Sequence, residues 1–517
     1  MNLKEVGRLI IAKVVFLTLS VTPFAPAYGA ADGLRSAWGT KYQAPSEQSR
    51  SPSRTHKPAN NAAIHWVRHW NEIAIDASGL DHTPVAAGEN RIFGEQLGPA
   101  RASRAMAIVH IAIFDATNAI EGGYQGYTAV TPSHGQVSLQ AAIARAAHDT
   151  LAALFPSQAT SFDIQMTADM AKIPNGKAKT DGSDLGHRAA LAILTMRAND
   201  GSQHVEPRVG IEFFIGNQPG QWRQDPISQI PLALGALWSG VKPFVMNSAD
   251  QFRTPPPPAL DSAAYTTAFD EVKRLGGDGV ITPTERSAEQ TAIGIYWAYD
   301  GTPSLCAPPR LYNQIAVQIA EQMGSNHMEL ARLLALANVA MADAAIAIWE
   351  SKYFYQFWRP VTGIRESDVG TGPTGLGDGN AATMGDVTFS PLGAPASNLT
   401  GPNFTPPFPA FPSGHAGFGG AIFQVLRRFY GTDNIPFTFV SDEFNGVTRD
   451  NQGNVRPLIA RSFSSLSKAE EENGQSRIYL GIHWSFDKTE GIAQGRRVTD
   501  YVLENILAAK HKTKPNK

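Results

Sequence analysis

The sequence predicts an all-α protein of two helical bundles, with a small β-hairpin and the functional site in the second bundle. Apolar residues recur at spacings of three and four over many stretches, which is the period of an amphipathic helix. Alanine-rich faces, such as the one at 104–115, allow helices to pack closely, as in a bundle. The prolines at 255–258 cannot continue a helix, so they mark the expected border between an N-terminal and a C-terminal bundle.

The first sixty residues are predicted to lie outside both bundles. In residues 1–29, basic residues precede a short apolar run at 14–21, and small residues at 27 and 29 fit a cleavage site, which indicates a signal peptide. A membrane anchor is the alternative, but the apolar run is short for a span and prolines follow it. Residues 30–60 lack periodicity and are predicted to be a flexible leader. We therefore expect an exported protein, periplasmic or secreted.

Two groups of predicted helices follow the leader, one in each bundle. The border residues separate an N-terminal bundle at 61–254 from a C-terminal bundle at 259–510. In the second group, Thr282 and Glu285 form a capping-box pattern with proline between them, which predicts a helix from there to about 299. The expected helices are 62–75, 98–120, 139–154, 161–173 and 184–199, then 263–275, 282–299, 310–323, 327–355, 415–430, 465–472 and 488–507.

Two other parts of the C-terminal bundle are predicted not to be helical. Residues 438–458 fit a short hairpin with Asn-Gln-Gly at its turn. Residues 366–411 are rich in glycine and proline and show no period, and such a long irregular stretch is more often a functional wall or lid than filler.

Composition excludes several classes of partner. The chain of 517 residues is 43% hydrophobic and 17% charged, with a formal net charge of −2. This balance gives no reason to expect binding to nucleic acid or to an anionic membrane surface. No segment after the signal reaches about 20 consecutive apolar residues, so we expect no membrane association after signal removal. The one cysteine, Cys306, excludes an intrachain disulfide.

Three short segments carry the residues for chemistry. They are Lys352 to Pro360, the tetrapeptide Pro-Ser-Gly-His at 412–415, and Ser476 to Asp487. Arginine forks match the geometry of an oxyanion, lysine adds a point charge, and a helix that starts after Gly414 directs free N–H groups to the same place. Together they predict a socket for a compact tetrahedral oxyanion, with the donors Lys352, Arg359, Ser413, Gly414, Arg477 and His483.

The two histidines of these segments add reactivity. One imidazole can attack or coordinate the central atom of the anion while the other transfers a proton. Asp487 follows His483 by four residues, one helical turn, and is placed to orient its ring. His483 is therefore the predicted nucleophile or metal ligand, and His415 is the predicted acid–base group.

The order Lys-x6-Arg-Pro, Pro-Ser-Gly-His and Ser-Arg-x5-His-x3-Asp resembles the signature shared by acid phosphatases of the phosphatidate-phosphatase type and vanadium-dependent haloperoxidases. Further residues resemble the chloroperoxidase branch. Trp349 and Phe408 match positions on the halide side of the pocket there, and Asp300 matches the carboxylate partner of the second arginine. Bromoperoxidases of this family characteristically carry histidine where Phe408 stands.

The resemblance implies a haloperoxidase that uses vanadate, with His483 as the metal ligand. Hydrogen peroxide and a halide, chloride or bromide, would be its substrates, an organic molecule a further one, and hypohalous acid its product. Lys352 would polarise the bound peroxide, and His415 would deprotonate incoming peroxide. An apolar wall of Trp349 and Phe408 would leave the halide poorly hydrated and easier to oxidise.

Other interpretations of these residues stay open. An exported acid phosphatase would use His483 to form a phosphohistidine and His415 as the acid for the leaving alkoxide. An exported oxyanion-binding protein without catalysis would need neither histidine to react. Trp349 and Phe408 could be plain core, and Asp300 a solvated carboxylate. We expect structural roles for His65 and His69, which lie one turn apart, for His110 in an apolar helix, and for Cys306.

Overall fold

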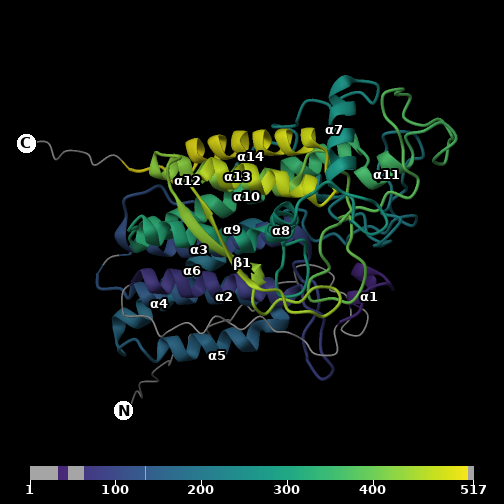
Figure 1. Cartoon of the computed structure of the whole chain (residues 1–517). Coiled ribbons are helices and arrows are strands. Elements are labelled where there is room, and N and C mark those ends of the chain that lie inside the picture. The colour runs from purple at the N-terminus through teal and green to yellow at the C-terminus, as the bar shows by residue number, and fades with distance from the viewer. Residues whose placement is uncertain (1–32, 45–62, 134, 511–517) are drawn as a thin grey trace, which may run out of the picture.

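The computed structural model describes residues 33–44, 63–133 and 135–510, which form a mainly helical fold (Figure 1). The predicted signal peptide lies outside these residues. Most long helices run side by side, and the irregular connections gather at one end of the molecule with α1, α7 and α11. The helices are α1 Gly33–Trp38, α2 Ala63–Asp81, α3 Gly98–Glu121, α4 Leu139–Leu154, α5 Ala159–Met170, α6 Lys177–Arg197, α7 Ala263–Leu275, α8 Ala288–Tyr296, α9 Pro308–Gln322, α10 His327–Tyr355, α11 Pro360–Arg365, α12 Gly414–Tyr430, α13 Leu466–Tyr479 and α14 Ser485–Asn505, with short 3-10 turns at Pro156–Gln158 and Trp238–Gly240.

The β-hairpin is present. Strand β1, Phe437–Asn445, pairs in antiparallel register with β2, Leu458–Phe463. Phe437 lies opposite Phe463 and Val440 opposite Ala460, and the register shifts between Val440 and Asn445. The predicted hairpin is confirmed, although its second strand begins where the prediction ended, because the connection between the strands is longer than a tight turn.

Helix α10 occupies the centre of the fold. It packs against α3 from the N-terminal half and against α12 and α14 from the C-terminal half. It begins with a capping box in which Asn326 and Glu329 bond each other's backbone N–H groups. The helix is long and apolar enough to cross a membrane, but 94% of its most apolar window is buried inside the protein. Its apolar character is therefore explained by its place in the core.

The two predicted bundles share one hydrophobic core. No helix crosses 255–258, as the prolines predict. However, the largest buried cluster contains apolar side chains from α2, α3 and α4 together with others from α9, α10 and α12. The carboxylate of Asp343 on α10 also accepts hydrogen bonds from the backbone N–H groups of Phe244, Val245 and Met246. The border in the sequence is thus not a border in the packing.

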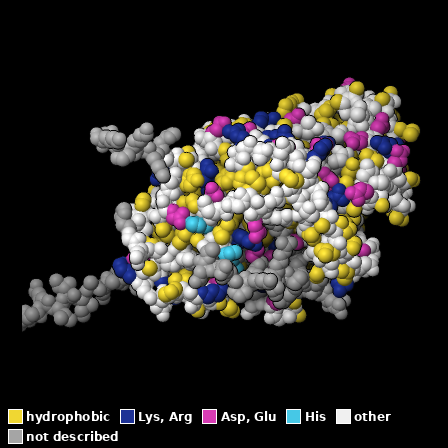
Figure 2. Space-filling view, turned by 60° about the vertical axis from the view of Figure 1, so that its left-hand side comes forward, with side chains coloured by type: hydrophobic (Ala, Val, Ile, Leu, Met, Phe, Trp, Pro, Cys, Tyr) yellow, Lys and Arg dark blue, Asp and Glu magenta, His cyan; other side chains and the backbone are white. Residues whose placement is uncertain are grey.

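On one face of the molecule, charges are mixed rather than gathered by sign. On the face seen in Figure 2, basic and acidic side chains lie interspersed among polar and apolar atoms. This distribution agrees with the formal net charge of −2. The cations of the predicted site, Lys352, Arg359 and Arg477, are buried inside the molecule.

The expectation of an unstructured leader at 30–60 is wrong for part of that range. Residues 33–38 form α1, and Trp38 and Tyr42 are buried. They join an apolar cluster with Phe404 and other side chains distant in sequence. The local sequence has no helical periodicity, so the segment is held in place by the burial of its aromatic side chains against distant residues. The rest of the predicted leader, 45–60, lies outside the described residues.

The capping box predicted at Thr282 is also wrong. Helix α8 begins at Ala288, and its capping box is formed by Ser287 and Gln290. The hydroxyl of Thr282 instead accepts a hydrogen bond from the backbone N–H of Ser390. A tertiary contact therefore uses the side chain that would have capped the helix.

Candidate active site

The structure brings the predicted site residues together around one cavity, and seven of them line it directly: Asp300, Trp349, Phe408, Gly414, His415, Arg477 and His483. Trp349 and Lys352 lie near the end of α10, and Arg359 is the residue that precedes α11. Ser413 is the N-cap of α12, so Gly414 and His415 lie in its first turn. Arg477 lies in the last turn of α13, His483 in the connection between α13 and α14, and Asp487 in the first turn of α14.

The first two cations are held by backbone carbonyl groups. The Lys352 Nζ atom donates to Pro409 O and Ala410 O, both at 2.8 Å, so one of its three N–H groups is left for a ligand. Arg359 Nε donates to Phe408 O at 2.9 Å. Burial lowers the pKa of Lys352 well below its usual value, and the charge of Arg359 adds to this effect. A bound anion would offset that cost of buried positive charge.

The third cation has unused donors. Arg477 is 0% exposed, and its Nη2 donates to Asp300 Oδ1 at 2.7 Å. Its Nε and Nη1 atoms have no hydrogen-bond partner among the described residues. Among the described residues, the carboxylates that bond this group are Asp300, which pairs with Arg477, and Asp487, which pairs with His483. Because buried donors and charges are costly without partners, this arrangement suits an anion with several acceptor oxygens.

The ring of His483 is held in one orientation by hydrogen bonds. Its Nδ1 atom donates to Asp487 Oδ2 at 2.8 Å, and the Trp484 backbone N–H donates to the same oxygen. Nε2 therefore carries the lone pair, and it accepts from Arg359 Nη1 at 2.9 Å. Burial, and then the charges of Arg359 and Lys352, lower the pKa of His483 well below its ordinary value. A neutral imidazole with an oriented Nε2 is the form that coordinates a metal.

The ring of His415 is oriented by a backbone carbonyl group. Its Nε2 donates to the backbone oxygen of Ala298, so the lone pair is on Nδ1, which lies 3.7 Å from Asp300 Oδ1. Burial and the charge of Arg477 lower the pKa of His415 to about 3. The imidazole is thus neutral near pH 7 and can accept a proton at Nδ1.

An aromatic wall adjoins the cations. The rings of Trp349 and Phe408 meet edge to face, with centroids 5.1 Å apart. Lys352 Nζ lies 5.2 Å from the centroid of the Phe408 ring, and both rings are buried. The Trp349 indole donates to Leu234 O, and Gly235 has a positive φ with no room for a side chain beside that indole. The wall excludes water next to the cations.

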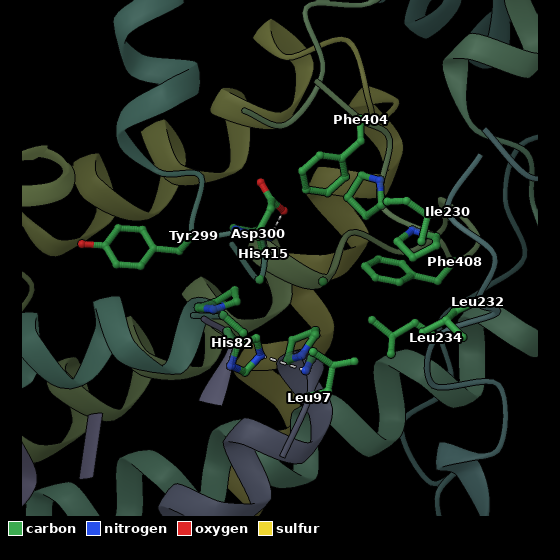
Figure 3. Close-up of a pocket in the computed structure, with 18 of the residues that line it drawn as sticks. His82, Leu97, Ile230, Leu232, Leu234, Tyr299, Asp300, Phe404, Phe408 and His415 are labelled. Carbon is green, nitrogen blue, oxygen red and sulfur yellow. Dashed lines mark hydrogen bonds and ion pairs between the residues drawn. The ribbon is translucent and has the colours of Figure 1, made fainter. Parts of the chain in front are cut away.

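The N-terminal half completes the cavity, which the sequence did not predict. Leu97, Ile230, Leu232 and Leu234 lie on one side with Phe404 and Phe408, while Asp300 and His415 lie on the other (Figure 3). The cavity has a volume of about 60 Å³. No motif marks these side chains, and only the fold brings them to the C-terminal residues.

His82 also lines this cavity but is fully engaged. Its Nδ1 atom donates to Ser78 O, and its Nε2 atom accepts from the backbone N–H of Gly98. Both ring nitrogens are therefore used to hold the end of α2 against the start of α3. His82 shapes the wall.

Two of the residues expected to be structural, His69 and Cys306, make structural contacts, and a third, His110, is buried. His69 bonds Asp169, and Cys306 is buried against the hydroxyl of Ser78. His110 is 0% exposed, and its ring nitrogens have no partner among the described residues. In the part of the chain that the structure describes, no group of three or more His, Cys, Asp or Glu side chains is placed to hold a metal ion.

Comparisons with known proteins agree with the geometry. The family model of the VCPO second helical-bundle domain matches residues 332–510. Vanadium chloroperoxidase from Curvularia inaequalis is 30% identical over 505 residues, covering 82% of this chain and 79% of that protein.

Solved structures share the fold. A bacterial vanadium-dependent iodoperoxidase has a TM-score of 0.68 at 24% identity, covering 88% of this chain and 100% of that one. A bacterial vanadium-dependent chloroperoxidase, in its holo form, has a TM-score of 0.59 at 18% identity, covering 81% of this chain and 94% of that one. The helical architecture is therefore common to these proteins.

Proposed function

The chain belongs to the vanadium haloperoxidase family, and on this premise we propose that it oxidises halide with hydrogen peroxide to hypohalous acid or an equivalent halogenating species, using vanadate as its cofactor. One observation carries the proposal. The buried Arg477 has two unpartnered donor atoms in a cavity where His483 presents a neutral, oriented Nε2. This combination fits an oxyanion that is also coordinated.

The residues present fit vanadate. His483 Nε2 would be its ligand, while Lys352, Arg359 and Arg477 would balance its charge and Ser413 and the Gly414 N–H would donate to its oxygens. When bound, vanadate supplies a Lewis acid that makes peroxide electrophilic without a change of oxidation state. Asp487 keeps the His483 proton on Nδ1, and Asp300 orients Arg477.

His415 and Lys352 would act on peroxide itself. His415 Nδ1 would take the proton of incoming peroxide, since the bond from Nε2 to Ala298 O leaves Nδ1 as the acceptor. The N–H of Lys352 that no carbonyl uses would stabilise the negative charge that develops on the peroxide oxygen. Both groups are buried, so water competes little with these interactions.

The family assignment does not say which halides the enzyme oxidises. The relatives above include chloroperoxidases and an iodoperoxidase. We propose that the halide range extends to chloride, because the dry wall of Trp349 and Phe408 would leave a chloride ion poorly hydrated beside the cations. Iodide and bromide are easier to oxidise and should also react.

Phosphate has the same shape as vanadate, so the donor set alone would also suit a phosphatase. The alternative is an exported acid phosphatase with phosphohistidine at His483. The ring wall around Lys352 and Arg359 argues against it, since a phosphate ester needs room for its leaving group there.

The test uses protein stripped of metal and then reconstituted with vanadate. Halogenation of monochlorodimedone with peroxide is measured in iodide, bromide and chloride, and hydrolysis of p-nitrophenyl phosphate is measured on the stripped form. Vanadate-dependent halogenation supports the proposal, and activity in chloride supports the halide range. Efficient ester hydrolysis that vanadate only inhibits would establish the phosphatase instead.

Export remains part of the proposal. It rests on the signal-like pattern of residues 1–29. N-terminal sequencing of the mature protein should find Ala30 as the first residue, and a chain that keeps residue 1 in the cytoplasm would contradict it.

A further inference from the structure

One peptide group lies behind the aromatic wall of Trp349 and Phe408. It joins Leu234 to Gly235, and the Leu234 side chain lines the cavity beside Phe408 (Figure 3). Its carbonyl oxygen accepts hydrogen bonds from the Trp349 indole and from the Tyr353 hydroxyl, both at 3.0 Å. These two donors lie on successive turns of α10. The carbonyl group therefore holds the Trp349 ring in one orientation.

The N–H of the same peptide group is held by a carboxylate. In a planar trans peptide the N–H and C=O bonds point in opposite directions, so the Gly235 N–H points away from Trp349. It donates to Glu206 Oε2 at 2.5 Å. Gly235 has a φ of 78°, and a side chain there would collide with the Trp349 indole. The peptide group thus lies directly against the ring, and it cannot turn without loss of all three hydrogen bonds.

A further hydrogen bond joins this loop to the other ring of the wall. The backbone N–H of Leu234 donates to Pro407 O at 3.0 Å, and Phe408 is the next residue. Displacement of the 234–235 peptide group would therefore move the supports of both aromatic rings. The rings meet with centroids 5.1 Å apart, so a shift of either one opens a gap beside Lys352.

The carboxylate of Glu206 is itself buried and fixed. Its side chain is 4% exposed, and its Oε1 atom lies 3.1 Å from Arg101 Nη2 and 3.2 Å from Arg101 Nε. Arg101 also donates to the backbone oxygens of Ser202 and His204. Burial alone raises the pKa of Glu206, but the hydrogen bond to His204 and the charge of Arg101 outweigh this effect and lower the pKa below its ordinary value. Glu206 is therefore an ionised acceptor, which binds an N–H more strongly than a neutral one.

We propose that Glu206 is a positioning residue for halide selection, which holds the 234–235 peptide group and through it the wall of Trp349 and Phe408. The inference rests on the proposed function. Within the described part of the chain, the residues that line the cavity do not include Glu206 or Arg101, so Glu206 acts on the halide through the wall. A loosened wall would admit water, and hydration hinders the ion that is harder to oxidise more than the easier one.

The experiment compares Glu206→Ala with Glu206→Gln in the vanadate-loaded, full-length enzyme. Alanine removes the acceptor of the Gly235 N–H. Glutamine keeps an oxygen for that N–H but loses the charge that pairs with Arg101. Both variants should therefore be less stable than the wild type, whereas only Glu206→Ala releases the peptide group.

The measured quantity is the ratio of kcat/KM for chloride to kcat/KM for bromide, or of bromide to iodide if the wild type does not oxidise chloride. Because both constants come from one preparation, the ratio is independent of the fraction of active enzyme, and partial unfolding does not imitate a change in selectivity. Glu206→Ala should lower the ratio about fivefold, within the range that substitutions without ligand contact exert on a distant site. Glu206→Gln should keep a ratio close to that of the wild type.

Asp169→Ala is the matched control. Asp169 is also a buried carboxylate of the N-terminal half, and it bonds His69 and Lys172, neither of which lines the cavity. This variant should lose stability and keep the wild-type ratio. If Glu206→Ala does not fold, Glu206→Asp decides the matter, because its shorter side chain draws the carboxylate away from Gly235 while the charge for Arg101 remains. The ratio should then fall.

Three results would overturn the inference. Glu206→Ala could keep the wild-type ratio, which would show that the wall does not depend on Glu206. Glu206→Gln could lower the ratio as much as Glu206→Ala, which would assign the effect to the lost charge. The control could also lower the ratio, which would assign the effect to general loosening of the fold. Failure of the proposed function looks different, because the wild-type enzyme would then form no triiodide from iodide and peroxide with vanadate present.

Discussion

At the scale of single residues, the hydrogen bond from His483 Nδ1 to Asp487 decides which nitrogen faces the cavity. Asp487→Ala removes that partner and frees the ring to turn or change tautomer. We expect the affinity for vanadate to fall about 10- to 100-fold, as for other losses of a partner behind a metal-binding histidine. Titration of the stripped protein with vanadate, followed by recovery of halogenation, measures it.

The control for this variant is Asp500→Ala on the same helix. Asp500 is half-buried and bonds Arg428 and Gln424, away from the cavity. Equal vanadate affinity in the two variants would show that Asp487 does not position His483.

The pKa of His415 predicts a pH dependence. Burial and Arg477 lower it from 6.5 to about 3, so the neutral base persists as the pH falls and is lost only near the lower value. A bound anion offsets the charge of Arg477, which places the acid limb of kcat/KM for peroxide between these two values. The His415→Ala variant should lose most of the activity, and any residual kcat/KM for peroxide should no longer show this acid limb. A limb at or above pH 6.5 in the wild type would contradict this protonation scheme.

Phe408 is the residue that we propose controls halide preference. Phe408→His places a polar ring beside Lys352 and Arg359, where an apolar ring now lies. We expect the ratio of chloride to bromide turnover to fall by about an order of magnitude, because a wetter halide side favours the more easily oxidised ion. Initial rates in each halide measure it. An unchanged ratio would show that the Phe408 wall does not control halide choice.

At the scale of elements, strand β1 holds the loop that presents Asp300. Glu443 accepts hydrogen bonds from the Tyr299 backbone N–H, from Ser397 and from Arg456. Tyr299 has a φ of 45°, an uncommon conformation for a tyrosine that neighbouring contacts must stabilise. The next residue, Asp300, bonds Arg477. The hairpin thus acts on the site through this loop.

Glu443→Gln tests this arrangement. It leaves Arg456 buried without its counter-charge, a change that typically costs about 3–5 kcal/mol. We expect a lower melting temperature, and also a higher KM for peroxide, since the loop also supplies the Ala298 oxygen that orients His415. Thr438→Ala, an exposed change on the same strand, should alter neither quantity. A Glu443→Gln enzyme that is less stable but has an unchanged KM would limit Glu443 to a structural role.

Helix boundaries could be predicted from the sequence where only one capping pattern was present nearby. Helix α10 matched its predicted bounds, 327–355, because a long apolar period and a capping residue agree. Near α8, two capping patterns lie five residues apart, and the contact between Thr282 and Ser390 decides between them. Helix α13 extends seven residues past its predicted end, and that extension carries Arg477. Packing against other elements, which no local pattern reports, set these boundaries.

At the scale of the whole molecule, the sequence located the charged groups but not the space around them. The three motifs that contain Lys352, His415 and His483 can be recognised from residue type and spacing alone. No knowledge of how the helices pack is needed to assign these residues to one site. Trp38, His82 and Leu234 are ordinary residues in their own segments. They become part of the site only because the fold brings α1, the end of α2 and the 230–235 loop to the cavity that Trp349 of α10 also lines. That information lies in long-range contacts.

The shared core also predicts how the molecule unfolds. Apolar side chains of α3 pack against α10, and Asp343 of α10 bonds three backbone N–H groups of the N-terminal half. Residues 259–510 alone would expose the α3-facing side of α10 and leave a buried carboxylate unpaired, each of which is strongly unfavourable. We therefore expect that fragment to lack fixed tertiary structure by near-UV circular dichroism, and the full-length protein to unfold in a single calorimetric transition. Two separated transitions, or a folded fragment that binds vanadate, would show instead that the proline border divides two independent domains.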